Sequence, residues 1–594
     1  MNNEIKTCQN CKKDFSIDPD DFAFYSKMQV PPPTFCPECR AQRRLVWRNE
    51  RILYKRPCNA PGHSEIVVSN YGPHIKSPIY DQEFWWGDGW DPMSFGRGYD
   101  FSKPFFQQFK ELLDVVPAPN IATLQCVNSD YCNFTYQTKN CYLSIASDWN
   151  EDSAYLYHTV HSKNSLDQLG CANQERCYES VHTRGCYHSA FLYFSSGCMD
   201  SSLLYNCHNC QNCFGCVNLR NGKYQIFNQQ YSPEGYAEEI KKLNLGSYKN
   251  LQTALERFWK LTLRYPHRFA NILRTADVRG DYISEAKHCY DCFDVEGPAE
   301  NLRYAMYTVP NIKDVYDVYG SGGGQEQGYE ITSAGGGAQN TVCSALVWSG
   351  INNYYSHFCN ASSNIFGCVG LRNKKYCILN KEYSKEEYEA LVPKIRAHMD
   401  AQPYIDARSR VYKFGEFFPI EIAPFAYNET IAYEYFPLTR EEAAAAGYTW
   451  REQEKKSYGV TIDAADLPDD ITSVGDEILK AVIGCADHST CAEQCSGAFK
   501  IIPQELQYYR EMHLPLPRLC SNCRHSRRLK IRNPFQLWHR KCHCAGSSSE
   551  NGIYKNTGMH MHGAVPCSNE FETSYLSDRP EIVYCESCYQ SEAA

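Results

Sequence analysis

The sequence predicts a multi-domain, mainly β protein with helical insertions. Two internal duplications lead to this fold class: a cysteine-rich segment near the N-terminus returns near the C-terminus, and another segment is repeated in the centre. A chain of 594 residues is also too long for a single core. We therefore expect two terminal zinc-ribbon-like domains that flank a duplicated parallel β-helix-like (solenoid) centre.

The first duplication relates the two ends of the chain by a constant offset. Arg40 and Leu45 correspond to Arg524 and Leu529, an offset of 484 residues. Aromatic and proline positions follow the same offset, so a small fold was copied and not the cysteines alone. The C-x2-C turns are formed by Cys8, Cys11, Cys36 and Cys39 in the first copy, and by Cys520 and Cys523 in the second.

These cysteine pairs are typical of a structural zinc site. Two thiolate hairpins match a tetrahedral zinc ion, because each turn places two sulfurs about 2.3 Å from the metal. Four thiolates leave no position for water, so the ion would be structural rather than catalytic. The second copy differs, since its leading pair is Cys491-Ala-Glu-Gln-Cys495, with Cys485 as the alternative first member. Free or disulfide-bonded cysteines are the other interpretation of both copies.

The terminal segment predicts one more zinc site. Its thiolate pairs are Cys542-His-Cys544 and Cys585-Glu-Ser-Cys588, and the intervening Cys567, His560 and His562 are alternative ligands. Cys542 aligns with Cys58, but the N-terminal copy lacks the second pair, so we expect it to close by aromatic packing instead. The predicted total is two to three structural zinc ions and no iron.

The same pattern carries a resemblance to known proteins. The order C-x2-C, Phe, acidic residue, Tyr, Pro and C-x2-C-R-x2-R resembles the short "probable zinc-ribbon" domain of many bacterial proteins. The chain as a whole resembles an uncharacterised family of large cysteine-rich proteins from uncultivated small-genome bacteria. Members of that family are sometimes labelled CaiB/BaiF-type CoA-transferases, and the chain contains no residue pattern that supports this activity.

The second duplication lies in the centre, where residues 207–236 return at 359–388. Cysteines recur nine residues apart, as Cys132 and Cys141 do, within short β-favouring segments interrupted by Asn, Gly and Ser. Successive coils of about 20 to 24 residues predict a parallel β-helix or related solenoid, with an irregular multi-hairpin sheet as the alternative.

Four cysteines of this centre lie three residues apart, which is also compatible with a zinc or iron–sulfur site. The second copy keeps only Cys359 and Cys368, and this favours core packing. The four are Cys207, Cys210, Cys213 and Cys216.

These patterns divide the chain into nine segments. The expected units are an N-terminal zinc-ribbon-like domain (1–58), an aromatic-rich connection (59–124), solenoid repeat 1 (125–231), a helical segment (232–275), solenoid repeat 2 (276–383), a second helical segment (384–412), an aromatic and Pro-punctuated connection (413–480), the second zinc-ribbon-like domain (481–541) and a C-terminal metal-binding segment with four cysteine ligands (542–594).

Each ribbon also carries arginines at helical spacing, which places them on one helix face. Guanidinium groups match phosphate oxygens, so one hypothesis is contact with nucleic acid. The alternative is internal pairing with nearby acids such as Asp18, Asp20 and Asp21. The arginines are Arg40, Arg43, Arg44 and Arg48 in the first ribbon, and Arg524, Arg527, Arg528 and Arg532 in the second.

Composition restricts the function classes. The chain has 32 cysteines, 44 tyrosines and a net charge of −9, which argues against a protein that coats nucleic acid over its whole surface. We expect a cytoplasmic protein, because the N-terminus leads directly into the first metal motif and no apolar run could span a membrane.

The predicted function is a non-enzymatic zinc-binding scaffold or interaction protein, with nucleic acid or another protein as its partner. The rival is a polysaccharide-acting enzyme that uses a β-helix groove. Such an enzyme would need clustered acids or an Arg/Lys base on one face, and the sequence contains no recognisable catalytic motif or small-molecule site.

Overall fold

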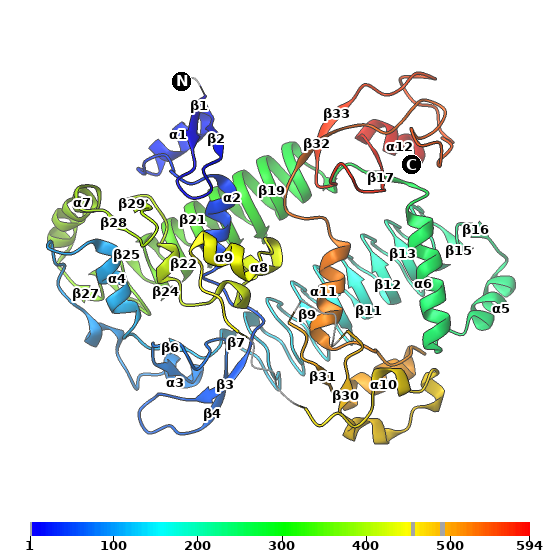
Figure 1. The fold of residues 1–594 in the computed structure, drawn as a ribbon, viewed down its shortest axis with the longest axis horizontal. Coiled ribbons are helices and arrows are strands. Elements are labelled where there is room, and N and C mark those ends of the chain that lie inside the picture. The colour runs from blue at the N-terminus through cyan, green and yellow to red at the C-terminus, as the bar shows by residue number, and fades with distance from the viewer. Residues whose placement is uncertain (1–2, 453–457, 488–493, 594) are drawn as a thin grey trace.

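The computed structural model describes residues 3–452, 458–487 and 494–593. Most of the regular structure is β, and two large, mainly parallel sheets occupy the centre (Figure 1). Helices are interspersed, and groups of cysteines lie near both termini. The prediction of a mainly β chain with helical insertions and terminal cysteine clusters is confirmed at this level.

The first sheet has eight strands that lie in chain order. Each strand pairs in parallel with the next at a shift of 12 residues, as Leu166 does with Tyr178, and only the last pair is antiparallel. Its strands are β9 (Ala154–Tyr157), β10 (Leu166–Leu169), β11 (Glu175–Val181), β12 (Tyr187–Tyr193), β13 (Ser202–Tyr205), β14 (Gln211–Phe214), β15 (Lys223–Ile226) and β16 (Gln229–Gln230).

The second sheet repeats this plan with longer early strands. The shift is 13 residues from β19 to β22, as between Ile312 and Gln325, and 12 residues afterwards. Its strands are β18 (Ile272–Leu273), β19 (Ala276–Thr308), β20 (Ile312–Ser321), β21 (Gln325–Gly335), β22 (Gln339–Trp348), β23 (Ile351–Tyr354), β24 (His357–Asn360), β25 (Ser363–Phe366), β26 (Lys375–Ile378) and β27 (Lys381–Glu382).

The coil length expected from the sequence is wrong, because the backbone bends every three residues and the shift between paired strands is much shorter. Tyr155, His158 and His161 all have left-handed φ angles, of 59°, 52° and 53°. The residue after each of the first two bends is small or apolar and buried, as Leu156 and Thr159 are. Four such triplets make up the shift of 12 residues between paired strands. The nine-residue cysteine spacing is therefore three triplets of one short period.

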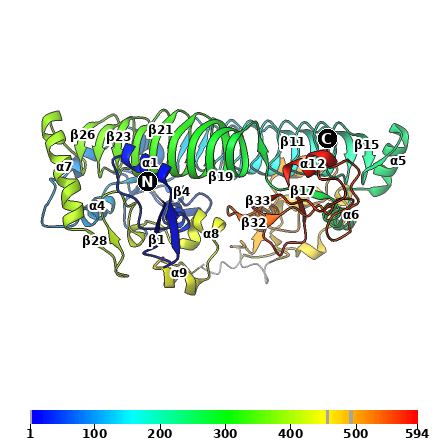
Figure 2. The ribbon, with the colours of Figure 1, turned by 90° about the horizontal axis from the view of Figure 1, so that it is seen from above.

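The central duplication is visible in the elements themselves. β14, β15 and β16 have the same lengths and sequence positions as β25, β26 and β27, shifted by 152 residues. A helix follows each sheet, α5 (Pro233–Leu243) after the first and α7 (Lys385–Ala401) after the second, and the side chains of Ser232 and Ser384 cap their N-termini. The two helices lie at opposite ends of the molecule (Figures 1 and 2).

The beginnings of the two sheets lie side by side and run in opposite directions. The ring of His158 is 3.5 Å from that of Tyr307, and further along the first sheet the ring of His182 is 4.2 Å from that of Tyr282. The residue number therefore rises along one sheet in the direction in which it falls along the other.

The terminal duplication also holds element by element. Helix α1 (Pro19–Lys27) corresponds to α10 (Pro503–Glu511), and α2 (Pro37–Leu45) to α11 (Ser521–Ile531). The hairpin of β1 (Glu4–Thr7) and β2 (Asp14–Ile17) corresponds to that of β30 (Ile483–Gly484) and β31 (Ala498–Phe499). The hairpin of β3 (Tyr54–Pro57) and β4 (Ile66–Ser69) corresponds to that of β32 (Trp538–Lys541) and β33 (Glu570–Thr573).

Each ribbon packs on the repeat that is farther from it in sequence. Helix α2 of the N-terminal ribbon contacts β20 and β21, and α11 of the C-terminal ribbon contacts β10 and β11 (Figure 1). One hydrophobic core joins Trp47 to Tyr329, and a second joins Tyr509 to Tyr178. The arrangement is therefore crosswise, with one ribbon and the opposite repeat in each core.

The remaining elements connect or cover these parts. Helix α6 packs Phe258 against Tyr193 of the first sheet, and the expected aromatic region places the buried Trp85 against Phe358 of the second. These elements are β5 (Ile79–Tyr80), α3 (Gln82–Trp86), η1 (Pro92–Phe95), α4 (Phe105–Leu113), β6 (Ala118–Pro119), β7 (Thr123–Leu124), β8 (Thr135–Tyr136), α6 (Tyr248–Thr262), β17 (Pro266–Arg268), β28 (Tyr404–Ile405), β29 (Val411–Tyr412), η2 (Ile420–Ile422), η3 (Tyr427–Glu429), α8 (Ile431–Tyr435), α9 (Arg440–Ala446), η4 (Ala464–Asp466), η5 (Ile471–Ser473), η6 (Asp476–Lys480), β34 (Ile582–Tyr584) and α12 (Glu586–Ala593).

Candidate metal centres and the arginine helices

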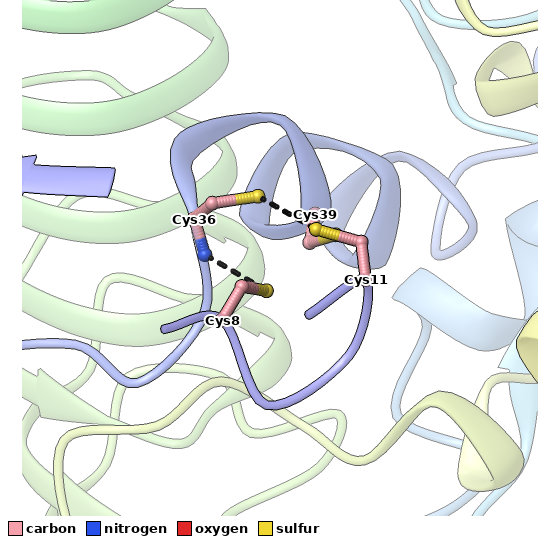
Figure 3. Close-up of side chains that lie close together, drawn as sticks. All are labelled: Cys8, Cys11, Cys36 and Cys39. Carbon is pink, nitrogen blue, oxygen red and sulfur yellow. Dashed lines mark hydrogen bonds between the residues drawn. The ribbon is translucent and has the colours of Figure 1, made fainter. Parts of the chain in front are cut away.

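The four predicted thiols of the N-terminal ribbon come together between the β1–β2 turn and the start of α2 (Figure 3). Cys8 follows β1, and the backbone N–H of Cys36 donates to the Cys8 Sγ at 3.2 Å. Cys36 is the N-cap residue of α2, and Cys39 lies in the first turn of that helix. The Cys11 and Cys36 sulfurs are 3.7 Å apart.

This spacing suits a tetrahedral ion. Sulfurs bound at about 2.3 Å in a tetrahedron lie about 3.8 Å apart. Hydrogen bonds from the Cys36 and Cys39 thiols lower the pKa of Cys8, whereas hydrogen bonds with Cys39 and Cys8 raise the pKa of Cys36. A cation among the four sulfurs would remove this competition by stabilising every thiolate. The group therefore has the number, spacing and chemistry of a metal site.

The second ribbon repeats the geometry with Cys485 in the place of Cys8. Cys495, Cys520 and Cys523 lie together as predicted, and the fourth member of the group is Cys485. The backbone N–H of Cys520 donates to the Cys485 Sγ at 3.2 Å, the same contact that Cys36 makes with Cys8. Cys491 lies outside the described residues. Cys485, the alternative first member named from the sequence, therefore lies with Cys495 beside the β30–β31 hairpin, and the prediction for Cys491 stays untested.

The C-terminal segment brings its cysteines together in a different combination from the expected one. Cys542, Cys585 and Cys588 form a group with Cys567, and not with Cys544. The backbone N–H of Cys585 donates to the Cys542 Sγ at 3.2 Å, so the contact seen in both ribbons occurs a third time. Cys544 belongs to a second group with His560, His562 and Cys588. Cys588 is therefore common to both groups.

The N-terminal counterpart of this segment has lost most of the ligands. Cys58 keeps its place, and the backbone N–H of Asp81 donates to its sulfur at 3.2 Å, as the N–H of Cys585 does to that of Cys542. The ring of Phe84 packs 4.8 Å from that of His63 and 5.5 Å from that of Tyr80. A smaller group of Cys58, His63 and Glu65 remains there.

Seven of the eight arginines are buried and form no exposed stripe, which favours internal pairing over the hypothesis of phosphate contact. Arg40 and Arg44 are each 1% exposed and Arg43 is 0% exposed, because α2 lies against the second sheet. Arg527 is the exception, with a side chain that is 57% exposed and 3.1 Å from Asp487. The buried set is Arg40, Arg43, Arg44, Arg48, Arg524, Arg528 and Arg532.

The arginines of α2 pair with carboxylates of the second repeat and of the connection that follows it, rather than with Asp18, Asp20 or Asp21. Arg40 Nε lies 2.9 Å from Asp317 Oδ2, and Arg44 Nη1 lies 3.0 Å from both Asp317 Oδ1 and Glu330 Oε2. Arg43 bridges Glu330 and Glu416 at 2.6 and 2.8 Å. The guanidinium forks are thus occupied inside the molecule and offer no surface to phosphate.

The arginines of α11 make the equivalent contacts with the first repeat. Arg524 Nε lies 3.0 Å from Asp167 Oδ2, and Arg528 Nη1 lies 2.8 Å from Asp167 Oδ1 and 2.7 Å from Glu179 Oε2. Arg532 lies 3.2 Å from Asp294 of the second repeat. Burial raises the pKa of Glu179 to about 7 despite the charge of Arg528. Sequence spacing could not identify these acids, because they lie hundreds of residues from their arginines.

Glu50, which the sequence did not single out, joins the first ribbon to both repeats. It pairs with Arg48, accepts a hydrogen bond from the Tyr157 hydroxyl at 2.7 Å and lies 3.5 Å from His158. Burial alone would raise its pKa, but Arg48 and His158 lower that pKa to about 2. The carboxylate is therefore held ionised where the ribbon and the two sheets meet.

The four closely spaced cysteines of the first repeat lie in its core. They belong to one apolar cluster with Leu192 and Leu204, and they are at most 1% exposed. Their thiols contact backbone carbonyl oxygens, as the Cys207 Sγ does at 3.4 Å from the Cys216 oxygen. In the described part of the chain they form no metal-ligand group. The set is Cys207, Cys210, Cys213 and Cys216.

The buried carboxylates described above converge on arginines and not on an open groove. Catalysis on a polysaccharide would need acids that face the substrate, and Asp167, Asp317 and Glu330 are 0% exposed. These three carboxylates are therefore not available to a substrate.

Comparisons with protein-family models, with curated proteins and with solved structures found no match. The resemblance to a cysteine-rich bacterial family stays a prediction. Among the described residues, none of the helices combines the length and the apolar character needed to cross a membrane.

Proposed function

We propose that the chain is a non-enzymatic scaffold in which zinc-ribbon-like modules lock together the two halves of a parallel β-solenoid. The repeated three-residue bends and the parallel shifts of 12 or 13 residues support the solenoid interpretation of the two sheets. The cysteine groups supply metal sites at the places where the modules meet these sheets. The proposed metal ions are structural and have no catalytic role.

The observation that carries this proposal is the position of each ribbon's thiol group at the start of an arginine helix. Cys36 caps α2, Cys39 lies in its first turn, and the next residue, Arg40, pairs with Asp317 of the opposite repeat. Cys520, Cys523 and Arg524 repeat this order on α11. A metal ion held by these cysteines would fix the helix start, and the helix start positions the buried arginines.

Zinc is the metal that this chemistry favours. All-thiolate tetrahedral sites bind zinc or iron, and zinc is usual where paired thiolate turns form the core of a small module. Metal-binding free energy in such modules is folding free energy, so each ion would hold its ribbon and the attached repeat in place.

The proposal does not retain nucleic acid as a partner. Seven of the eight arginines of the predicted contact surface are buried, and the chain carries a net charge of −9. The remaining interaction surface would be for another protein.

Metal analysis of the full-length chain tests the proposal. We expect at least three zinc ions per chain and no iron absorbance, with one ion fewer in Cys36→Ser. Cys368→Ala is the matched control, because Cys368 is a buried core cysteine outside the ligand groups. A wild-type zinc content below one, a brown iron-containing protein, or equal metal loss in both variants would contradict the proposal.

A further inference from the structure

The C-terminal module contains more metal-binding side chains than one ion can use. Its two ligand groups share Cys588, and within each group all ligand atoms lie within 4.8 Å of one another. Two four-coordinate ions that share one ligand need seven donors, and the two groups supply that number. The donors are the thiols of Cys542, Cys544, Cys567, Cys585 and Cys588 and the imidazoles of His560 and His562.

The shared residue lies between the two groups. The Cys588 Sγ is 3.2 Å from the His562 Nε2, and on the same side the Cys544 Sγ is 3.2 Å from the His560 Nδ1. In the other group the Cys567 and Cys585 sulfurs are 3.9 Å apart, close to the separation in a tetrahedral thiolate site. A thiolate sulfur has enough lone pairs to bind two ions at once.

The two histidines are held with one ring nitrogen directed at the cluster. The His560 Nε2 lies 2.7 Å from Glu592 Oε1, and both side chains are 1% exposed. The His562 Nδ1 lies 2.7 Å from the carbonyl oxygen of Val565, which can only accept a hydrogen bond. Each ring therefore donates through one nitrogen and keeps the other, His560 Nδ1 or His562 Nε2, for a metal. This is the usual support of a metal-bound histidine, in which a carboxylate or carbonyl fixes the tautomer.

Amide groups support two of the sulfurs in the same way. Asn556 Nδ2 donates to the Cys544 Sγ at 3.2 Å, and Asn569 Nδ2 donates to the Cys585 Sγ at 3.3 Å. Hydrogen bonds of this kind stabilise the ionised thiolate, which is the form that binds metal. One such amide serves each group.

The N-terminal copy is an internal comparison. There, residues 58–65 connect β3 to β4, whereas residues 542–569 connect the corresponding β32 to β33. The longer connection contains Cys544, His560, His562 and Cys567. The position of Cys588 in α12 is taken by Phe84 in α3, whose ring packs against His63. The shared ligand and the extra ligands thus occur together in one copy and are absent together from the described residues of the other.

We propose that the C-terminal module binds two divalent metal ions, with zinc as the chemical fit, bridged by the sulfur of Cys588. One ion is held by Cys542, Cys567, Cys585 and Cys588, and the other by Cys544, His560, His562 and Cys588. This inference rests on the metal binding proposed above and adds a fourth ion to the chain. The paired site would hold together residues 542–569, the long connection between β32 and β33, which has little regular structure.

Native mass spectrometry of the full-length zinc-loaded chain tests the count. We expect four zinc ions in the wild type and three in the double variant His560→Ala/His562→Ala. His539→Ala is the control, since His539 lies in the same module but outside both groups, and it should keep four. Three ions in the wild type would overturn the paired site and leave the scaffold proposal standing, whereas no zinc would overturn both. Four ions in the double variant would also overturn the paired site.

The bridge has its own readout in the cobalt-loaded protein. Two Co²⁺ ions joined by a thiolate couple magnetically, so the electron paramagnetic resonance signal per cobalt should be smaller in the wild type than in the double histidine variant. An equal signal per cobalt would overturn the bridge. Glu592→Gln keeps all seven ligands and covers the case in which the double variant does not fold. It should still bind four zinc ions but lose one to a chelator at a concentration 10- to 100-fold lower than the wild type requires, and an unchanged chelator profile would overturn the assignment of His560.

Discussion

The guanidinium of Arg528 lies 2.8 Å from the carboxylate of Asp167, and both side chains are buried. Its counterpart Arg44 lies 3.0 Å from Asp317 in the other half of the molecule. In each case a ribbon helix pairs with an acid of the distant repeat. These equivalent contacts relate the two duplications to one another, because each ribbon occupies the same place on its repeat.

Replacement of Arg528 should destabilise the protein strongly. Arg528→Gln leaves Asp167 and Glu179 buried without their cation, and breaking a buried pair in this way costs about 3–5 kcal/mol. The matched control is Arg527→Gln, whose exposed pair with Asp487 is worth about 0–1 kcal/mol. Chemical denaturation measures the difference. Equal effects of the two substitutions would mean that the buried network contributes little to stability.

Loss of a ribbon metal should loosen the opposite repeat. In Cys36→Ser we expect faster hydrogen exchange in β20 and β21, because α2 no longer holds its arginines against them. In Cys520→Ser the faster exchange should occur in β10 and β11 instead. Exchange mass spectrometry on both variants makes each the control of the other. Loosening confined to the mutated ribbon would contradict the coupling between metal and repeat.

Acidification should destabilise the fold through His357. Burial lowers the pKa of His357 to about 4 from its ordinary value of 6.5, and neither ring nitrogen has a hydrogen-bond partner among the described residues. The unfolded chain therefore binds a proton below pH 6.5 that the folded chain does not bind until about pH 4. This residue alone should remove about 2 kcal/mol of stability between pH 7 and pH 5.

The corresponding measurement compares the wild type with His357→Leu in zinc-containing buffer from pH 7 to pH 5. Leucine does not titrate, so the free energy of unfolding of the variant should fall less steeply with acid. Parallel curves for the two proteins would show that His357 does not titrate in this range.

A ladder of asparagines should stabilise the bends of the second sheet. Asn352 has a left-handed φ of 60°, accepts a hydrogen bond from Asn340 at 2.7 Å and donates one to Asn364 at 2.9 Å. Asn352→Ala removes both bonds and strains the backbone, at a cost of about 2 kcal/mol. Asn352→Gly removes the bonds but tolerates the bend, so thermal unfolding should rank it between the wild type and the alanine variant.

The sequence was informative where a local pattern decides the structure. Paired thiolate turns bring sulfurs together through a few residues of backbone, so Cys8, Cys11, Cys36 and Cys39 could be grouped from spacing. The same reasoning could not choose the fourth ligand between Cys485 and Cys491, or between Cys544 and Cys567. The fold of the intervening segment determines which sulfur lies beside the other three.

The burial of the ribbon arginines against distant segments could not be predicted from residue spacing. A row of arginines at helical intervals looks the same whether it faces solvent or carboxylates of another segment, and Asp317 and Glu330 have no sequence signal that links them to α2. The period of the repeat was accessible in principle. The cysteines at 132, 141, 177, 186, 198, 207, 210, 213 and 216 are all separated by multiples of three residues, which matches the three-residue bends and not the longer coil that was expected.

The crosswise packing also affects the order in which the chain can complete its structure during synthesis. Asp167 and Glu179 leave the ribosome long before Arg524 and Arg528. Helix α2 cannot pack on β20 and β21 until these later strands have been synthesised. Asp167 and Asp317 are thus each paired with arginines of a ribbon and not with arginines of their own repeat. A nascent chain that stops before residue 520 would therefore carry a first repeat with uncompensated carboxylates, so the last part of the protein to be made completes the part that was made early.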